Sequence, residues 1–381
     1  MGPRAVYVHV PFCEQICHYC DFNKFFLKNQ PVDEYLNDCE TEMSRTVARF
    51  PFDRIESIYV GGGTPTSLST VQLEKLLLAI RHHFRINEPD RIEFTVEVNP
   101  GSAEPDKLAM MRRNGVNRLS IGVQTFDGDL LKKIGRDHKP EDVTDTIEKC
   151  REAGFENISI DLMFGLPGQT LSNFEDTIDR AVSLGIEHVS AYSLKIEEKT
   201  VFYQLAKKGR LSLPHEDTEA DMYDLLISKL AEAGFHMYEI SNFARGNKES
   251  VHNITYWNNE EYYGIGAGAH SYMEGVRRQN HGPLPKYMKA IADGELPYRE
   301  EHAVPVKEQM EEELFMGLRK TEGVSLSRFE KRYGKPVTEV FGATVDKLMK
   351  QGLLERSGSC LRLTEKGRFL GNEVFEHFLL D

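Results

Sequence analysis

The sequence predicts an α/β protein with a partial barrel of the (β/α)6 type followed by a smaller, winged-helix-like α+β domain. Two observations predict the barrel and its companion. From residue 5 to about residue 240, short β-branched or apolar runs alternate with longer amphipathic stretches, which is the pattern of repeated strand–helix units around a parallel sheet. The chain of 381 residues is also long for one domain, which favours a large domain with a smaller one beside it.

Seven segments have the composition of strands in the barrel. They span residues 5–10, 55–60, 91–98, 116–123, 157–162, 188–194 and, less regularly, 235–240. Most are followed by a helical pattern, such as the apolar stripe of Val71, Leu73, Leu76, Leu77 and Ile80. Barrel active sites collect at the carboxyl ends of the strands, so we expect the functional groups in the loops that follow these segments. Residues 1–240 are assigned to this barrel.

The rest of the chain divides into two further regions. Between residues 241 and 305 the periodicity fails while Asn, Gly, Tyr and Pro accumulate, so we expect an irregular connecting or capping region. Helical patterns return at residue 306, and residues 361–367 resemble the strand and turn of a winged-helix module. Residues 306–381 hold 13 basic and 13 acidic side chains, so this domain lacks the charge of a nucleic-acid binder.

The whole chain is acidic, with 47 Lys and Arg against 60 Asp and Glu and a net charge of -13. This balance disfavours nucleic acid and anionic membrane surfaces as partners and favours small-molecule ligands. The first cysteine lies at residue 13, which leaves no room before it for a secretory signal, so we expect a cytoplasmic protein. Peripheral membrane contact and assembly into a homodimer stay open.

Three cysteines follow the first predicted strand. Cys13, Cys17 and Cys20 form a Cys-x3-Cys-x2-Cys run, whereas the other three cysteines are scattered and do not complete a tetrahedral zinc site. Cysteine thiolates are the usual ligands of iron–sulfur clusters, and four are needed to close a 4Fe-4S cubane. We therefore predict a 4Fe-4S cluster with one open iron, to which a substrate can bind.

A glycine-rich turn follows the second predicted strand. The segment 61–65, Gly-Gly-Gly-Thr-Pro, lets backbone N–H groups approach a ligand because no side chain intervenes at Gly62 and Gly63. It lacks the Gly-Lys-Ser/Thr ending of a phosphate loop. We interpret the segment, including Thr64, as a binding loop, and the alternative is a tight strand-to-helix turn.

Four polar residues lie near the ends of the later strands. Glu97 and Asp161 are single carboxylates in otherwise apolar strands, where burial is costly without a partner. A ribose hydroxyl pair or an ammonium group of a ligand would provide one, as would a neighbouring arginine in a purely structural role. Gln124 and Arg136 are weaker signals, each as compatible with a structural role as with ligand binding.

The cysteine spacing resembles that of the radical S-adenosylmethionine (SAM) superfamily. The resemblance implies that the open iron chelates the amino and carboxylate groups of SAM, whose one-electron reduction yields an adenosyl radical. Within this superfamily the chain is similar to the oxygen-independent coproporphyrinogen III oxidases and their heme chaperone branch. The similarity covers nearly the whole chain, and the motifs that match are Tyr7, 8–13, 61–65, 122–124 and 161–170.

The resemblance implies roles for individual residues. Tyr7, Gly62 and Glu97 match positions that contact the cluster-bound SAM. A second set of positions lines another SAM site in the oxidases, and here it consists of Gly63, Thr64, Gln124, Arg136 and Asp161. The chaperone branch looks similar at these positions, so they discriminate little between the two activities.

Three features favour the chaperone branch. The oxidases carry a fourth cysteine two residues after the third, where this chain has Phe22, and a longer segment before the motif. Residues 252–257, His-Asn-Ile-Thr-Tyr-Trp, resemble a signature of the chaperones whose histidine is implicated in heme binding. Imidazole is a common axial ligand of heme iron, so the resemblance makes His252 a heme-binding candidate; the alternative is a hydrogen-bonded core histidine. His270, at the end of the glycine-rich segment 264–270, is a secondary candidate for contact with the ligand.

We therefore expect a heme chaperone that binds heme and a SAM-liganded 4Fe-4S cluster and transfers heme to acceptor hemoproteins. The alternative is an oxygen-independent coproporphyrinogen III oxidase, which would decarboxylate two propionates to give protoporphyrinogen IX. No residue is assigned as catalytic, and whether SAM is cleaved stays open.

Overall fold

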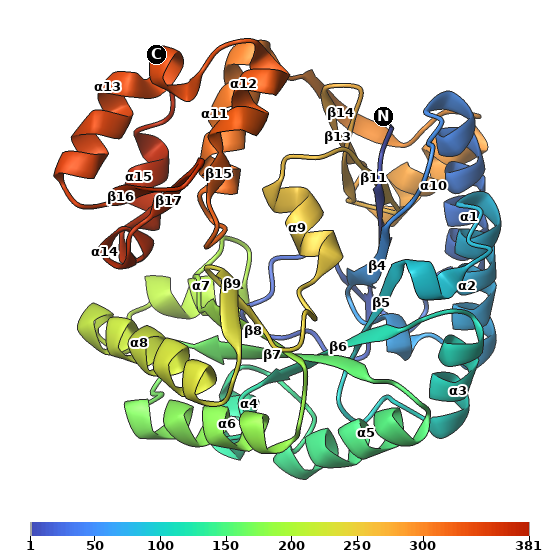
Figure 1. Cartoon of the computed structure of the whole chain (residues 1–381). Helices are drawn as coiled ribbons and strands as arrows, with labels where there is room; N and C mark the ends of the chain where they lie inside the picture. Colours follow the sequence, from blue (N-terminus) through green and yellow to red (C-terminus); the bar gives the residue numbers. More distant parts are fainter. Residues whose placement is uncertain (1, 381) are drawn as a thin grey trace.

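Six parallel strands form the centre of the computed structural model, which describes residues 2–380 (Figure 1). In spatial order they are β1 (Ala5–Val10), β4 (Ser57–Gly62), β5 (Glu93–Val98), β6 (Arg118–Gln124), β7 (Asn157–Phe164) and β8 (His188–Ser193). Each pairs in parallel with its neighbour. The sheet does not close, because β1 and β8 each pair with a further strand on their outer side. The prediction of a partial barrel is therefore confirmed.

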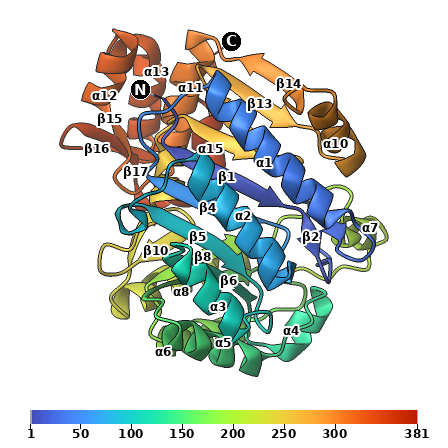
Figure 2. The same ribbon diagram turned by 90° about the vertical axis from the view of Figure 1, so that its right-hand side faces the viewer.

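Helices cover the outer face of these strands, as Figure 2 shows for the first three. They are α1 (Val32–Arg49), α2 (Thr70–His83), α3 (Pro105–Arg113), α4 (Gly128–Lys133), α5 (Pro140–Glu152), α6 (Leu171–Ser183), α7 (Val201–Lys207) and α8 (Glu216–Glu232), with short turns η1 (Pro65–Ser67) and η2 (Pro89–Arg91). The predicted apolar stripe of α2 packs inward except at Val71, which is 76% exposed. Ser69 caps this helix by accepting a hydrogen bond from the Gln72 backbone N–H.

The structure differs from the expectation for residues 241–305, which contain regular elements. These are β10 (Asn242–Ala244), α9 (Val251–Trp257), β11 (Tyr262–Ile265), β12 (His270–Met273), β13 (Val276–Asn280), α10 (Leu284–Ala292) and β14 (Tyr298–Ala303). Strand β11 pairs in parallel with β1, and β12, β13 and β14 continue the sheet in antiparallel order. These strands are three to six residues long and joined by tight turns, so no long periodic pattern marks them in the sequence.

The last predicted strand also differs from the expectation. Residues 235–240 form β9 (His236–Glu239), which pairs in antiparallel fashion with β10 at the edge of the sheet. It is therefore not a further parallel strand of the barrel. On the other side of β1, apolar residues of β11, β12 and α10 join the same hydrophobic core as the barrel strands.

The C-terminal part has its own core and its own three-stranded sheet, in the order β15-β17-β16. Its elements are α11 (Val306–Gly317), β15 (Val324–Ser325), α12 (Leu326–Tyr333), α13 (Val337–Lys350), β16 (Leu354–Ser357), β17 (Cys360–Leu363), α14 (Glu365–Phe369) and α15 (Gly371–Glu376). This arrangement is the expected winged-helix-like one. It lies beside the β9 edge of the barrel, where the Thr321 N–H donates to the Tyr238 carbonyl at 2.9 Å (Figure 1).

No helix between residues 2 and 380 is both long enough and apolar enough to cross a membrane.

Candidate functional site

The cysteine loop leaves the carboxyl end of β1 and covers the ends of the neighbouring strands. Two short strands, β2 (Phe12–Cys13) and β3 (Phe25–Phe26), pair in parallel and hold the two ends of the loop together. Cys13 is buried, whereas Cys17 and Cys20 are partly exposed, and all three are free thiols. They line one cavity with a volume of about 1170 Å³, which we call the cluster cavity.

The three thiols suit a cluster better than a single ion. Among residues 2–380, no three His, Cys, Asp or Glu side chains are grouped closely enough to hold one metal ion. In a cubane each thiolate ligates a different iron, so the sulfurs stand farther apart than the ligands of one ion. No other cysteine lines the cluster cavity. The donor set therefore fits a 4Fe-4S cluster with three protein ligands.

Burial disfavours the ionised form of these thiols in the protein alone. It raises the pKa of Cys13 to about 11 and also raises the pKa of Cys20. Thr64 donates a hydrogen bond from Oγ1 to the Cys13 sulfur at 3.7 Å, which acts in the opposite direction. A bound iron stabilises thiolates far more strongly than one hydroxyl group does, so thiolate formation is coupled to cluster binding.

The glycine turn after β4 packs against the cysteine loop. A Cβ atom on Gly63 would lie 2.7 Å from the Phe12 carbonyl oxygen, and Gly62 has a φ of +111°. The N–H groups of Gly63 and Thr64 donate to the carbonyls of Val10 and Phe12, both at 2.8 Å. The expectation that these N–H groups face a ligand is therefore wrong. They fix the start of the cysteine loop instead.

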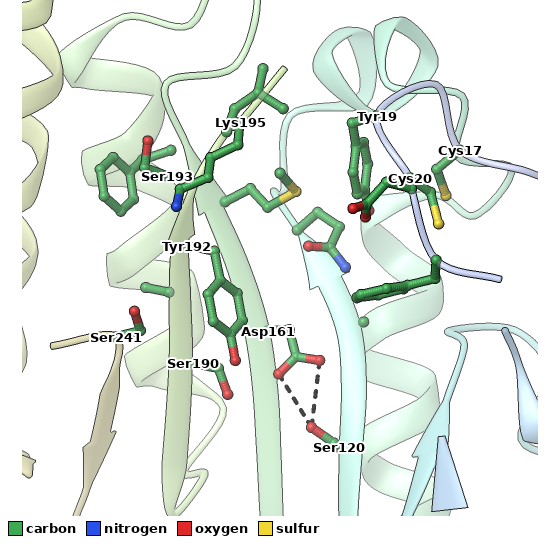
Figure 3. A pocket seen from close by; sticks show the side chains of 18 of the residues that line it. Cys17, Tyr19, Cys20, Ser120, Asp161, Ser190, Tyr192, Ser193, Lys195 and Ser241 are labelled. Carbon is green, nitrogen blue, oxygen red and sulfur yellow. Dashed lines mark hydrogen bonds between the residues drawn. The ribbon is translucent and has the colours of Figure 1, made fainter. Parts of the chain in front are cut away.

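Both predicted carboxylates lie in the cluster cavity with hydroxyl partners. Glu97 accepts hydrogen bonds from the Tyr59 hydroxyl at 2.8 Å and from the Gly62 N–H at 3.0 Å. Asp161 accepts from Ser120 Oγ at 3.2 Å (Figure 3). Burial raises the pKa of Glu97 to about 7 and also raises that of Asp161. Neither forms an ion pair in the described part of the chain, so each is available to a cationic or hydroxyl-bearing ligand.

Gln124 and Arg136 line the same cavity next to Gly122. Gln124 has a φ of +66° where the pairing of β6 with β7 shifts by one residue. A Cβ atom on Gly122 would lie 3.1 Å from Arg136 Nη2 and 3.2 Å from Gln124 Nε2. Arg136 donates to the Tyr19 hydroxyl at 3.2 Å, while its Nε is buried without a hydrogen-bond partner. A polar ligand next to Gly122 would meet these donors.

The predicted residues fall into two groups, because Tyr7 and His252 line a different cavity. This second cavity has a volume of about 780 Å³ and shares Asp21, Phe22, Lys24, Tyr59 and Asn253 with the cluster cavity. The Tyr7 hydroxyl lies 2.8 Å from His9 Nδ1. Contact between Tyr7 and a cluster-bound ligand stays a prediction.

His252 is buried in the first turn of α9 and is 2% exposed. Its Nδ1 lies 3.0 Å from the Ser57 Oγ, and its Nε2 lies 2.9 Å from the Tyr256 hydroxyl. Burial lowers its pKa to about 3, so the imidazole is neutral. Both ring nitrogens are thus engaged within the protein, and an iron atom can reach His252 only if one of these contacts breaks.

The far wall of the cluster cavity contains residues that sequence reasoning missed. In Figure 3, Cys17, Tyr19 and Cys20 lie on one side, and Tyr192 and Lys195 of the β8 end lie on the other. Arg319, which follows α11, also lines the cavity and stacks over the Trp257 ring at 4.6 Å. From the sequence, only Trp257 could have indicated this wall, because it belongs to the 252–257 motif. Arg319 lies in the predicted C-terminal domain, far from the other lining residues in the sequence.

Comparison with known proteins agrees with this arrangement. The model of the Radical SAM superfamily matches residues 7–181, and the model of the HemN C-terminal domain matches residues 304–370. The chain is 53% identical to the heme chaperone HemW of Bacillus subtilis over 99% of both chains. It is 45% identical to the heme chaperone HemW of Lactococcus lactis, over 100% of this chain and 98% of that protein.

The solved structures include a match over nearly the whole chain. The coproporphyrinogen III oxidase HemN of Escherichia coli, a radical SAM enzyme, superposes with a TM-score of 0.86 at 25% sequence identity. The alignment covers 99% of this chain and 90% of that protein. Fold and sequence together place the chain: it belongs to the HemW family within the radical SAM superfamily.

Proposed function

We propose that this chain is a cytoplasmic heme chaperone that holds a SAM-liganded 4Fe-4S cluster, binds heme and passes it to acceptor hemoproteins. The relatives named heme chaperone HemW support the proposal, because the similarity reaches 53% identity over 99% of both chains. The structural observation that supports a bound cluster is that three free cysteines line one cavity.

The cluster cavity supplies matched groups for SAM. Cys13, Cys17 and Cys20 would hold the cluster, which when reduced supplies an electron to SAM. The Glu97 carboxyl lies at the end of β5 with a pKa of about 7, so near neutral pH it readily becomes a carboxylate when a cation approaches. Asp161 is placed to accept hydrogen bonds from hydroxyl groups, and Arg136 brings an unpartnered N–H for an acceptor atom.

The oxidase alternative is not favoured. Phe22 occupies the position of the fourth cysteine and is 64% exposed at the rim shared by both cavities. Relatives at 53% and 45% identity are named heme chaperones, whereas the similarity to the E. coli oxidase is 25%.

Two assays on one anaerobically reconstituted sample test the proposal. Titration with hemin should give saturable binding of heme, followed by its absorption spectrum. Incubation of the same sample with coproporphyrinogen III, SAM and a low-potential reductant should give no protoporphyrinogen, while a known oxidase in parallel does. Formation of protoporphyrinogen, or failure to bind hemin with the cluster intact, would overturn the proposal.

A further inference from the structure

The second cavity has a wall of aromatic side chains. It lies between the cysteine loop, the amino end of α9 and the antiparallel extension formed by β12, β13 and β14. Its aromatic lining residues are Tyr7, Phe22, Tyr59, Tyr256 and Tyr262. A volume of about 780 Å³ is within the usual range of small-molecule sites. The cavity is therefore suited to a large, flat and mainly apolar ligand.

Three side chains without a hydrogen-bond or ion-pair partner face this cavity. His270 of β12, Arg299 of β14 and Lys199 before α7 are all exposed and line it. In the part of the chain that the structure describes, none of the three has a side-chain hydrogen bond or an ion pair. By contrast, Arg277 and Arg278 in the adjacent strand β13 are paired with Glu312 and Glu301. The unpaired groups come from three separate segments and meet only here.

The charge of the second cavity differs from that of the cluster cavity. Two carboxyl side chains and three Lys or Arg side chains line the second cavity, whereas ten carboxyl and six Lys or Arg side chains line the cluster cavity. The lining of the second cavity therefore attracts a ligand with two carboxylate groups, whereas the lining of the cluster cavity repels it. Heme combines such a pair of propionates with a flat apolar ring and an iron that binds imidazole.

We propose that heme lies in the second cavity with the imidazole of His270 on its iron and with Arg299 and Lys199 beside its propionates. This inference rests on the proposed function, namely that the chain carries heme. His270 has both ring nitrogens free, whereas those of His252 are held by Ser57 and Tyr256. Iron ligation by His270 therefore breaks no existing hydrogen bond. His252 then supports the wall of the cavity as a positioning residue.

Electron paramagnetic resonance of the hemin complex tests the ligand. The full-length protein is prepared with its cluster in the oxidised, EPR-silent state, so that only ferric heme contributes. His270→Ala should lose the imidazole-ligated signal of the wild type, and added free imidazole should restore it. His236→Ala is the matched control, because His236 is exposed, pairs with Glu249 and lines neither cavity. Because free imidazole also ligates unbound hemin, an unchanged urea denaturation curve of His270→Ala separates loss of the ligand from loss of the fold.

Two outcomes would overturn the inference, and they differ. If the wild type binds hemin and His270→Ala keeps the same signal, the site is wrong while the proposed function stands. If the wild type binds no hemin, the proposed function fails and the site with it.

The propionate contacts are tested with two probes. The double variant Arg299→Glu, Lys199→Glu should bind hemin about tenfold more weakly, since two exposed attractions become repulsions. Its affinity for hemin dimethyl ester, whose propionates carry no charge, should match that of the wild type. Equal loss for both probes, or no loss for hemin, would contradict the assignment of these two cations.

Discussion

The Tyr256 hydroxyl lies 2.9 Å from Nε2 of His252, one turn earlier in α9, so this histidine faces a hydroxyl group at the point where an iron would bind. The other nitrogen of the ring is held by Ser57, and the ring also packs on Tyr59 with 5.3 Å between centroids. The histidine of the 252–257 motif is thus built into the wall between β4 and α9. These contacts favour a supporting role for His252 over a role as an iron ligand.

Tyr256→Phe should destabilise the protein by about 1–3 kcal/mol, because it leaves a buried imidazole nitrogen without a partner. Urea denaturation at neutral pH measures the change. The heme-bound EPR signal should stay that of the wild type, since Tyr256→Phe leaves His270 in place. A new imidazole-ligated species in this variant would show that a freed His252 binds the iron.

Glu97 should make stability depend on pH. Burial raises its pKa from 4.5 to about 7 in the folded protein, so the unfolded chain ionises first as the pH rises. The protonated Glu97 carboxyl contributes fully to the stability of the fold below pH 4.5. This contribution is lost progressively up to about pH 7 and changes little above that. In Glu97→Gln this pH-dependent loss of unfolding free energy, up to about 3 kcal/mol in the wild type, should be absent.

The pH comparison must be made between wild type and Glu97→Gln without cluster or SAM. Glu42, which accepts a hydrogen bond from the Tyr287 hydroxyl, also has its pKa raised to about 7 by burial. It titrates in the same window in both proteins, so the difference between their denaturation curves reports Glu97 together with its electrostatic effect on Asp161. Parallel curves from pH 4.5 to 7 would show that Glu97 does not titrate there.

Gly63→Ala should lower the cluster content, because the new Cβ atom would meet the backbone of Phe12 at the start of the cysteine loop. Iron and sulfide analysis after anaerobic reconstitution measures the effect. Gly128→Ala at the start of α4 is the control, since nothing lies within 4 Å of its Cβ position. Full iron content in Gly63→Ala would show that the loop adjusts to the methyl group.

Cys17→Ala should abolish the 4Fe-4S cluster and weaken heme binding, since the cysteine loop forms part of the second cavity. Asn23 ties this loop to that cavity by donating to the carbonyls of Ala267 and Gly282 at 2.8 and 2.9 Å. Cys360→Ala, on β17 outside both cavities, should change neither property. Hemin titration of both variants measures the link, and equal affinities would show that heme binding is independent of the cluster.

The sequence predicted the barrel and the cysteine loop well, because each rests on a local pattern. Residues 5–10 form β1 as expected, and the predicted strand 188–194 extends one residue beyond β8. The extension of the sheet was not predictable, since β1 pairs with β11 more than 250 residues later. The second cavity was missed for the same reason, as His270 and Arg299 reach it through that extension of the sheet, whereas Lys199 comes from the loop before α7. The hydrogen-bond partners of the Gly63 and Thr64 N–H groups were misjudged, because backbone pairing partners cannot be identified from glycine spacing. Contact of these two residues with SAM stays a prediction.

Transfer of heme to an acceptor is the activity that distinguishes a chaperone from a protein that only binds heme. The reconstituted protein, loaded with one equivalent of hemin and freed of excess, is mixed with an apo-hemoprotein, and the spectrum of the acceptor is followed. The acceptor should gain heme faster than it does from a His270→Ala sample, with free hemin removed in both by a scavenger. No transfer from a loaded, cluster-containing protein to any apo-hemoprotein tested would contradict a chaperone function.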